Sequence, residues 1–589
     1  MKNARNILTI AALAATTLLT ATEKRQPNVI ILLSDDQGWG DLGFTGNTTV
    51  RTPNIDGIAR DGMIMDNFYV CAVSSPTRAE LLTGRYHLRS GVCSTSTGGE
   101  RMNLDEQTIA EHFRDGGYQT AMFGKWHSGT QYPYHPNARG FEEYYGFCSG
   151  HWGNYWNPIL EHNGKIVKGE GFIADDLTNH ALEYIKGQKN HPFFLYLAFN
   201  TPHTPMQIPD TWWNGMKNRK LTQFATNPDT EEMGTTKSAL ALAENIDWNV
   251  GRLLNLLEEL NIEEETIILY FSDNGPNGYR WNGGMKGKKG AVDEGGVRSP
   301  LCIRWLGHIQ GGVVNEQLSG AIDLMPTLLG LTGMKYESKK PLDGIDLSKQ
   351  FLDSQKKGQD RVLYSYWAKK LSVRIPGFML DNDQHLYQTS VDRGQLQDLS
   401  GTNMKELARL KSERVKFERE ILPCLPKKDE RPFLIGHPEE YSSKLPARDA
   451  KIEGMVERSN TAPNCSYFTN WRSTDAKILW NVDVLESGTF EVKVYYTCDA
   501  RNIGSIVNLK TDRGESLRYR LAEVNDSPMQ GADMDRVPRK SESYMKGFKP
   551  FSMGEIHLEK GKALLSLQAE SIANEEVMNF WLLELIRKK

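Results

Sequence analysis

Four apolar runs of strand length, each followed at once by charged or histidine side chains, constrain the fold of this chain most strongly. The runs are NVIILLS (28–34), QTAMF (119–123), FFLYLAF (193–199) and TIILYFS (266–272). Helical patterns lie between them, and in residues 244–260 one helix face carries Ile246, Val250, Leu253 and Leu257. Buried strands that alternate with helices predict an α/β domain with a mainly parallel sheet sandwiched by helices.

Side chains able to bind ions or move protons stand where these four strands end. They are Asp35 and Asp36 after the first run, Lys125 and His127 after the second, His203 after the third, and Asp273 and Asn274 after the fourth. In an open α/β sheet, ligands bind beyond the carboxyl ends of the strands. Turns are polar in any case, but four such ends together predict one shared site.

The acidic and amide side chains of this group predict a metal site. Asp35, Asp36, Asp273 and Asn274 offer oxygen donors only. Several hard oxygen donors suit Ca²⁺, and Mg²⁺ less well, because Ca²⁺ accepts irregular cages of six or more oxygens. Two buried neighbouring carboxylates also need a cation between them.

Length, charge and cysteine content set further limits. The chain has 589 residues, enough for two or more domains. Its 70 basic and 74 acidic residues leave a formal charge of -4, so no net field would recruit nucleic acid. Seven scattered cysteines without a Cys-x-x-Cys pair fit neither a disulfide framework nor a zinc cluster.

The first 22 residues read as a secretory signal peptide. Lys2 and Arg5 precede an apolar run over residues 7–19, and small residues follow near Ala21. A membrane anchor is the alternative, but the run is short, and no later stretch reaches the roughly 20 apolar residues of a membrane span. We therefore predict an exported protein, periplasmic or secreted, without a membrane span.

The chain beyond residue 360 changes character. We predict a catalytic α/β domain over 27–360, a small α+β subdomain with short strands and a charged helix over 361–430, and a polar linker over 431–445. Residues 488–498 alternate strictly, with Phe490, Val492, Val494 and Tyr496 on one face. This pattern predicts an additional antiparallel β-sandwich domain over 446–589.

One further motif carries a family resemblance. In SSPTRAELLTGR (74–85), Ser74, Pro76, Thr77 and Arg78 precede a leucine-rich helical pattern that ends at Gly84-Arg85. This stretch resembles the signature of the formylglycine-dependent sulfatases, arylsulfatase-type members of the alkaline phosphatase superfamily. Companion motifs match in order from residue 27 to about 430: LLSDDQGWGDLG, FGKWHSG, TPHTP, FSDNGP and KGAVDEGGVRSP. The resemblance implies an alkaline phosphatase-like fold and a sulfuric ester hydrolase.

The resemblance also implies a nucleophile. Ser74 would be oxidised by a maturase to formylglycine, whose hydrated aldehyde attacks sulfur through one hydroxyl and expels sulfate when the other is deprotonated. An unmodified serine would remain as a stable sulfate ester. Asp35, Asp36, Asp273 and Asn274 would hold the metal, together with the modified Ser74.

The remaining implied roles concern charge and proton transfer. Arg78 would stabilise the hydrate, Lys125 and Lys289 would neutralise the sulfate, His127 would be the base, and His203 would protonate the leaving alcohol. Lys286 or Lys288 could take the place of Lys289, because KGKKG offers three lysines. Arg85 would support the site structurally, and Trp126 would serve packing.

A serine at position 74, where most of the family has cysteine, implies a bacterial enzyme matured by an oxygen-independent radical maturase before export. Cys71 is three positions too early to replace Ser74 without losing the register to Pro76 and Arg78. Thr77 stands where serine is common and keeps the hydroxyl.

The expected substrate is a sulfated mono-, oligo- or polysaccharide, a hypothesis that rests on the resemblance and on the extra domain. That domain could bind glycan or shape the pocket, and the aromatics of SGHWGNYWNP (149–158) could stack on a sugar or pack in a core. Two other functions compete: a phosphatase or phosphodiesterase of the same superfamily, and a non-catalytic glycan-binding protein with this fold.

Overall fold

The computed structural model describes residues 25–338, 340–426 and 428–588. The predicted signal peptide, residues 1–22, lies outside the described residues. Within the described part of the chain, no helix is both long and apolar enough to cross a membrane.

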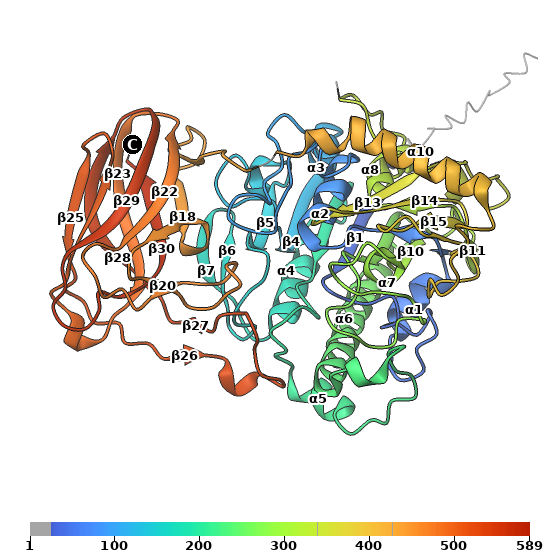
Figure 1. Ribbon diagram of the computed structural model, residues 1–589, viewed down its shortest axis with the longest axis horizontal. Coiled ribbons are helices and arrows are strands. Elements are labelled where there is room, and N and C mark those ends of the chain that lie inside the picture. The colour runs from blue at the N-terminus through green and yellow to red at the C-terminus, as the bar shows by residue number, and fades with distance from the viewer. Residues whose placement is uncertain (1–24, 339, 427, 589) are drawn as a thin grey trace, which may run out of the picture.

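A ten-stranded mixed sheet forms the centre of the larger domain (Figure 1). In spatial order its strands are β11 (Val313–Asn315), β2 (Met63–Met65), β10 (Leu301–Arg304), β9 (Thr266–Ser272), β1 (Asn28–Ser34), β8 (Phe193–Ala198), β4 (Gln119–Lys125), β5 (Glu143–Phe147), β6 (Ile159–His162) and β7 (Lys165–Lys168). The five strands from β9 to β5 run parallel, whereas β10, β6 and β7 are joined to the sheet by antiparallel pairs. The prediction of a mainly parallel sheet covered by helices is therefore confirmed.

Helices cover both faces of this sheet because the strands are apolar on both sides. In β1, Ile30 and Leu32 face one core, while Val29, Ile31 and Leu33 face the other. The first core is closed by α1 (Pro53–Arg60), α4 (Ile173–Gln188), α5 (Asp210–Met216) and α6 (Met233–Glu259). The second is closed by α2 (Ser74–Thr83), α3 (Ile109–Asp115), α8 (Leu324–Leu331) and α9 (Ser348–Leu352).

The four strands singled out in the sequence are neighbours in the order β9-β1-β8-β4. Their register is fixed near the carboxyl ends, where Ser34 pairs with Ser272 and Leu33 with Ala198. Because these strands are parallel, the polar residues that follow them emerge at one edge of the sheet. The structure thus brings these strand ends to one place.

A four-stranded antiparallel sheet and a long helix make a smaller layer after the large sheet. The elements are β13 (Leu363–Trp367), β14 (Lys370–Ile375), β15 (Phe378–Leu380), β16 (Leu386–Tyr387) and α10 (Met404–Glu420). Leu407, Leu410 and Phe417 of α10 are buried against this sheet. Arg374 of β14 pairs with Glu294 of the short helix α7 (Glu294–Val297), and this links the layer to the larger domain.

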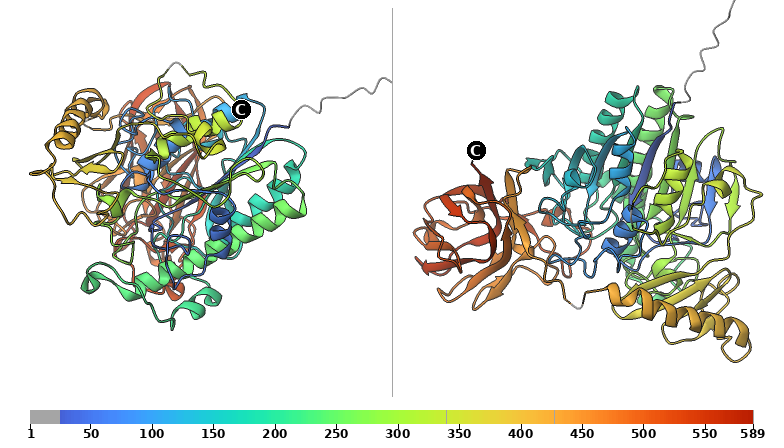
Figure 2. Two further views of the ribbon diagram at one scale, coloured as in Figure 1. Left: turned by 90° about the vertical axis from the view of Figure 1, so that its right-hand side faces the viewer. Right: turned by 90° about the horizontal axis from the view of Figure 1, so that it is seen from above.

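The last part of the chain folds into two packed, mainly antiparallel sheets, which lie at one end of the molecule (Figures 1 and 2). One sheet contains β17 (Phe433–Ile435), β19 (Lys451–Glu453), β22 (Lys477–Val484), β24 (Ile506–Thr511), β25 (Ser516–Arg520) and β29 (Gly561–Ser571). The other contains β18 (Ser442–Pro446), β20 (Glu457–Arg458), β21 (Phe468–Thr469), β23 (Gly488–Thr497), β28 (Lys549–Leu558) and β30 (Asn579–Arg587). The alternating residues predicted to share one face of β23 are buried between the two sheets: Phe490, Val492, Val494 and Tyr496.

Two short strands, β17 and β18, lie in the stretch that the sequence predicts as a linker. They pair with β22 and β30, so this stretch adds strands to both sheets of the sandwich. A separate apolar cluster joins the two domains: Trp152 and Ile159 of the larger domain pack against residues that include Phe548 and Trp581 of the sandwich.

Candidate active site

Ser74 is the first residue of α2, and its hydroxyl points into the group of polar residues at the strand ends. Ser74 Oγ donates to Asp273 Oδ2 (2.5 Å) and accepts from Arg78 Nε (2.9 Å). Every residue of α2 is buried, and Gly84 (φ 64°) ends the helix in the left-handed conformation that glycine favours. The free N–H groups of the first helical turn place a positive potential beside the Ser74 hydroxyl.

The hydroxyl of Thr77, one position after the proline, helps to hold the start of this helix. Thr77 Oγ1 donates to the backbone oxygen of Asp273 (2.6 Å) and accepts from the backbone N–H of Cys71 (2.9 Å). The side chain thereby ties α2 to the end of β9, and this fixes the distance between Ser74 and Asp273.

The four residues predicted to hold a metal lie together and are fully buried. Asp36 accepts from Asn274 Nδ2 (2.8 Å), and its own backbone N–H donates to Asp273 Oδ1 (3.2 Å). Three of their oxygens have no hydrogen-bond partner among the described residues: Asp35 Oδ1, Asp36 Oδ2 and Asn274 Oδ1. Buried oxygens without a donor are costly, so these three atoms fit a bound divalent cation.

Three cations surround the carboxylates. Lys125 Nζ lies 2.6 Å from Asp35 Oδ2, Lys289 Nζ lies 2.6 Å from Asp36 Oδ1, and Arg78 Nη2 lies 2.9 Å from Asp273 Oδ2. In KGKKG, therefore, Lys289 is the lysine that reaches the cluster. Lys286 instead pairs with Asp293 (3.2 Å), and Lys288 lies over the ring of Tyr279 (4.6 Å to its centroid).

The two candidate proton-transfer histidines differ in their contacts. His203 Nε2 lies 3.6 Å from Asp36 Oδ2, and its Nδ1 lies 2.6 Å from the backbone oxygen of Thr204. His127 Nε2 lies 2.9 Å from the backbone oxygen of Thr95, while its buried Nδ1 has no partner among the described residues. Hydrogen bonds and ion pairs link eight of the ten predicted site residues directly. His203 adds only its 3.6 Å approach to Asp36 Oδ2, and His127 has no hydrogen bond or ion pair with the other nine.

Burial and the surrounding charges shift the acidities of these groups. Burial and the neighbouring Asp273 raise the pKa of Asp35 to about 8. Burial alone would raise the pKa of Asp36 as well, but Lys289 and His203 hold it below its usual range. Burial and the charge of Lys125 lower the pKa of His127 well below its usual range, so this imidazole is neutral.

The formal charges of the cluster cancel. When Asp35, Asp36 and Asp273 are all ionised, as ligands of a metal must be, their three negative charges balance the three positive charges of Arg78, Lys125 and Lys289. A divalent cation at the three free oxygens would leave the site with a charge of about +2. Such a site attracts an anionic ester.

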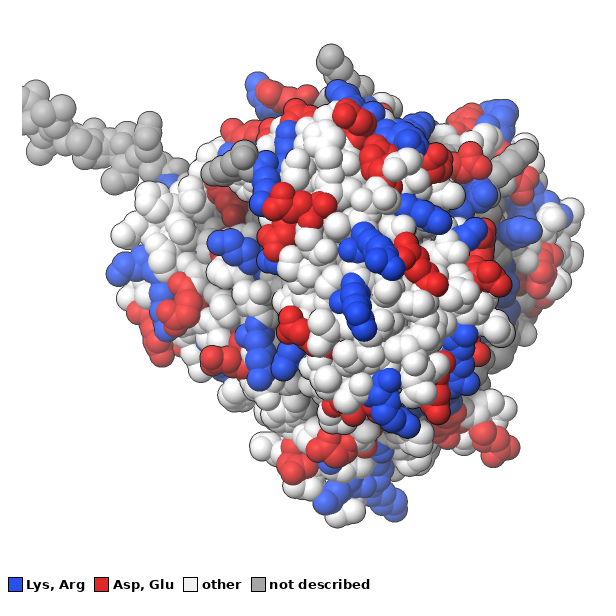
Figure 3. All heavy atoms as spheres, turned by 90° about the vertical axis from the view of Figure 1, so that its left-hand side faces the viewer, with Lys and Arg blue, Asp and Glu red and all other residues white. Residues whose placement is uncertain are grey.

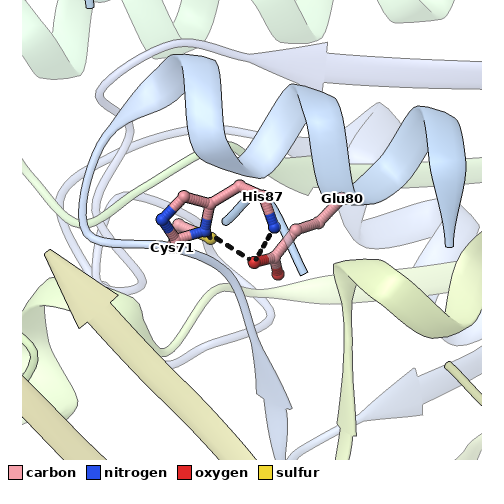
Figure 4. Close-up of side chains that lie close together, drawn as sticks. All are labelled: Cys71, Glu80 and His87. Carbon is pink, nitrogen blue, oxygen red and sulfur yellow. Dashed lines mark hydrogen bonds and ion pairs between the residues drawn. The ribbon is translucent and has the colours of Figure 1, made fainter. Parts of the chain in front are cut away.

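Cys71 lies close to Glu80 of α2 and to His87 (Figure 4). His87 Nδ1 lies 2.9 Å from Glu80 Oε1 and 3.7 Å from Cys71 Sγ. Burial and the charge of Glu80 raise the pKa of the Cys71 thiol well above its usual range, which makes it a poor nucleophile. Asp273 and Arg78 are contacted by Ser74 and not by Cys71.

Other predicted supporting residues have structural contacts. Arg85 pairs with Glu106 (3.1 Å), and the fully buried Trp126 donates its indole N–H to the backbone of Tyr134 (3.0 Å). Among the aromatics of 149–158, Trp152 packs between Phe147 and Trp581, and Tyr155 is completely buried.

Sequence reasoning missed polar residues that line the same site. His151 stacks on His203 with ring centroids 5.4 Å apart, and its Nε2 has no partner among the described residues. Asn200, which follows soon after β8, is also fully buried. Asn200 follows the third apolar run, so the strand-end argument could have included it. His151 lies in an irregular loop, where no periodicity marks a site.

Known proteins share both the sequence and the architecture. The sulfatase family model matches residues 27–334. N-acetylgalactosamine-6-sulfatase of Mus musculus is 33% identical over 400 residues, which cover 62% of this chain and 73% of that protein. Arylsulfatase A of Homo sapiens is 32% identical over 379 residues, which cover 58% of this chain and 70% of that protein.

Among solved structures, the crystal structure of Ps i-CgsB in complex with k-i-k-neocarrahexaose is similar, with a TM-score of 0.63 and 30% identity. The match covers 69% of this chain and 96% of that chain. The family model alone spans more than half of the 589 residues. This chain therefore belongs to the sulfatase family and is a sulfuric ester hydrolase.

Proposed function

We propose that this sulfatase hydrolyses a sulfate ester of a sulfated carbohydrate, using formylglycine formed from Ser74 and one bound Ca²⁺. The observation that carries the proposal is the position of Ser74 Oγ, 2.5 Å from Asp273 Oδ2 and 2.9 Å from Arg78 Nε. These contacts connect the hydroxyl to the group of buried carboxylates and cations.

The donor set supports Ca²⁺ as the metal. Asp35, Asp36, Asp273 and Asn274 would hold the ion, together with the modified residue 74. Oxygen donors without a nearby thiolate suit Ca²⁺, with Mg²⁺ as the second choice. When bound, the ion would make a neighbouring hydroxyl more acidic and draw electrons from the sulfate group.

Formylglycine at position 74 would supply a hydrated aldehyde. Attack of one hydroxyl on sulfur would break the bond between sulfur and the sugar oxygen, which leaves as the alcohol. Deprotonation of the other hydroxyl would then break the carbon–oxygen bond to the sulfate and restore the aldehyde. Arg78 would orient the hydrated aldehyde, because its guanidinium already donates to Ser74 Oγ and to Asp273 Oδ2. The N-terminus of α2 would add positive potential at the same point.

Charge and proton transfer would fall to the remaining residues of the site. Lys125 and Lys289 would bind the sulfate oxygens and stabilise the charge that develops on them. The neutral His127 would take a proton at Nδ1, its unpartnered nitrogen. Burial lowers the pKa of His203 to about 4, although Asp36 opposes this shift. An anionic ester beside His203 would favour the protonated ring, which could then protonate the leaving alcohol.

The sugar assignment is supported by the similar proteins. One relative is named for N-acetylgalactosamine 6-sulfate chemistry, and one similar structure holds a neocarrahexaose. A serine at position 74 further supports a bacterial origin and maturation by a radical enzyme before export to the periplasm or beyond.

Two measurements on purified, matured enzyme test the proposal. Mass spectrometry of the peptide that contains Ser74 should show a species lighter by two hydrogens, and nitrophenyl sulfate should be hydrolysed much faster than nitrophenyl phosphate. Faster phosphate hydrolysis by the unmodified serine would instead identify a phosphatase. A chain that binds sulfated sugar but hydrolyses neither ester would be a non-catalytic glycan-binding protein. Ser74→Ala serves as the control for contaminating activity.

A further inference from the structure

An arm of the C-terminal sandwich reaches the catalytic domain beside the active site. The arm, residues 529–546, is closed at its base by the paired strands β26 (Met529–Gln530) and β27 (Met545–Lys546). Figure 1 shows it extending from the sandwich towards α5 and α6. Arg536 anchors it there: its backbone N–H donates to the backbone of Met206 (2.9 Å), and its guanidinium pairs with Asp210 (2.6 Å).

The active site is more exposed at His203 and Lys289 than at its centre, and the arm contacts Thr204, the chain neighbour of His203. The side chains of Asp273 and Lys125 are 0% and 1% exposed, whereas those of His203 and Lys289 are 9% and 22% exposed. An ester would therefore reach the cluster past His203 and Lys289.

A cavity of about 270 Å³ lies beside the active site, and both domains line it. On the catalytic side, Thr204 and Lys288 line it, each the chain neighbour of an active-site residue, and Tyr279 lies with them. On the other side, the wall is formed by residues 537–542 of the arm. Ligand sites commonly measure roughly 300–1,000 Å³, so a cavity of this size suits one sugar unit better than a long chain segment.

Polar contacts fix the arm as one wall of this cavity. Thr204 Oγ1 donates to Glu542 Oε1 (2.5 Å), next to His203. Lys540 pairs with Glu232 (2.5 Å), the residue before α6. The arm is therefore held on both sides of the cavity by residues of the catalytic domain.

Lys288 is the cation of this cavity that remains available to a ligand. Its ammonium lies 4.6 Å from the centroid of the Tyr279 ring, and no carboxylate of the described residues lies within ion-pair distance of it. Tyr279 itself is 43% exposed, so part of this side chain is also accessible to a ligand.

Among the described residues, the outer face of the sandwich shows no cluster of positive charge that could bind a sulfated polymer (Figure 3). In Figure 3 its lysine and arginine side chains are interspersed with acidic ones. A surface that holds a sulfated polymer by electrostatics would gather positive charge. We therefore consider the arm, and not the outer face, as the part of this domain that contacts the substrate.

We propose that the cavity between the catalytic domain and the arm binds the sugar unit that carries the sulfate ester, and that Lys288 pairs with a second anionic group on the saccharide. This inference rests on the proposed function. It assigns the C-terminal domain to the substrate pocket and predicts a preference for saccharides with a carboxylate or a second sulfate.

The test compares kcat/KM across substrates within each full-length, matured variant. The substrates are nitrophenyl sulfate and a panel of hexosamine and galactose sulfates. The singly anionic members carry one sulfate, and the doubly anionic members carry a second sulfate or a linked uronic acid. Lys288→Ala should reduce the preference for doubly anionic over singly anionic sugars at least tenfold, mainly through KM. Ser541→Trp, which fills the cavity from the arm, should reduce activity on sugars at least tenfold more than activity on nitrophenyl sulfate. Lys562→Ala, an exposed lysine on β29, is the matched control and should behave as wild type.

Each outcome decides for or against the inference. Equal losses on all substrates, with a lowered melting temperature, would assign Lys288 and Ser541 a purely structural role and overturn it. So would a wild-type enzyme that hydrolyses nitrophenyl sulfate but shows no preference for doubly anionic sugars. Failure of the proposed function is recognised separately, because nitrophenyl sulfate hydrolysis and the modified peptide would then both be absent.

Discussion

Replacing Lys289 by alanine tests whether the site stabilises sulfate by charge. Lys289 Nζ lies 2.6 Å from Asp36 Oδ1. At that separation, with an effective dielectric constant of about 20, two unit charges attract by about 6 kcal/mol before desolvation is counted. An anionic oxygen of the ester at similar range would gain a part of this energy. Removing one such donor from a preorganised site typically costs roughly 3–4 kcal/mol, or about 10²–10³-fold in rate. We therefore expect kcat/KM of Lys289→Ala to fall by about that factor.

The assay is hydrolysis of nitrophenyl sulfate, normalised to the formylglycine content of each preparation. Lys286→Ala is the matched control, because Lys286 belongs to the same loop but pairs with Asp293 instead of the cluster. It should keep its activity within about threefold. The electrostatic argument would be refuted if Lys289→Ala kept wild-type activity, or if Lys286→Ala lost as much.

Three further predictions concern metal binding, pH and the sandwich core. Asn274→Leu removes one of the three unpartnered oxygens. In thermal unfolding, Ca²⁺ at about 100 times its Kd should stabilise the wild type by about 2.7 kcal/mol and should stabilise the variant much less. Equal stabilisation of both proteins would place the ion elsewhere. The Lys444 and His135 side chains that face Glu161 hold its pKa at about 2 against the effect of burial, below the usual 4.5, so this carboxylate contributes stability above pH 4.5 that is lost as pH falls towards 2. We expect the free energy of unfolding to fall by an amount on the order of 3 kcal/mol over this pH range. In the Glu161→Gln variant, the free energy of unfolding should depend much less on pH over the same range. A variant with the same pH dependence as the wild type would contradict this prediction. Trp480→Ala empties a fully buried site in the sandwich and should cost about 3–5 kcal/mol in denaturant unfolding; a cost below 1 kcal/mol would contradict this account of the core.

The sequence predicted the part of the site that parallel strands impose. Asp35, Asp36, Asp273 and Asn274 follow strands whose apolar runs can be read directly, and β1 and β9 bring them together. The bounds of those two strands, 28–34 and 266–272, agree with the structure, because buried parallel strands are marked by continuous apolar residues that end in turn residues.

The sequence did not determine the contacts that depend on loop conformation. Three lysines of KGKKG were equivalent by pattern, and only the loop conformation assigns Lys289 to Asp36 and Lys286 to Asp293. The role of the sandwich was equally open, since its polar contact to Thr204 comes from Glu542, more than 300 residues away in the chain. Neither helical nor strand periodicity predicts such contacts.

Both histidines proposed for proton transfer lie where the two domains meet. Glu542 of the arm binds Thr204, next to His203. On the opposite side, Asn464 of the sandwich donates to the Thr95 backbone oxygen that also contacts His127 Nε2. Gly150 lies against both Asn464 and His127. A side chain at position 150 would overlap Asn464 Nδ2 and His127 Nε2. The close approach therefore requires glycine at this position. Since the sandwich fixes the surroundings of both imidazoles, removing it would disturb the chemistry as well as the sugar pocket, and point substitutions in the arm are needed to separate the two effects.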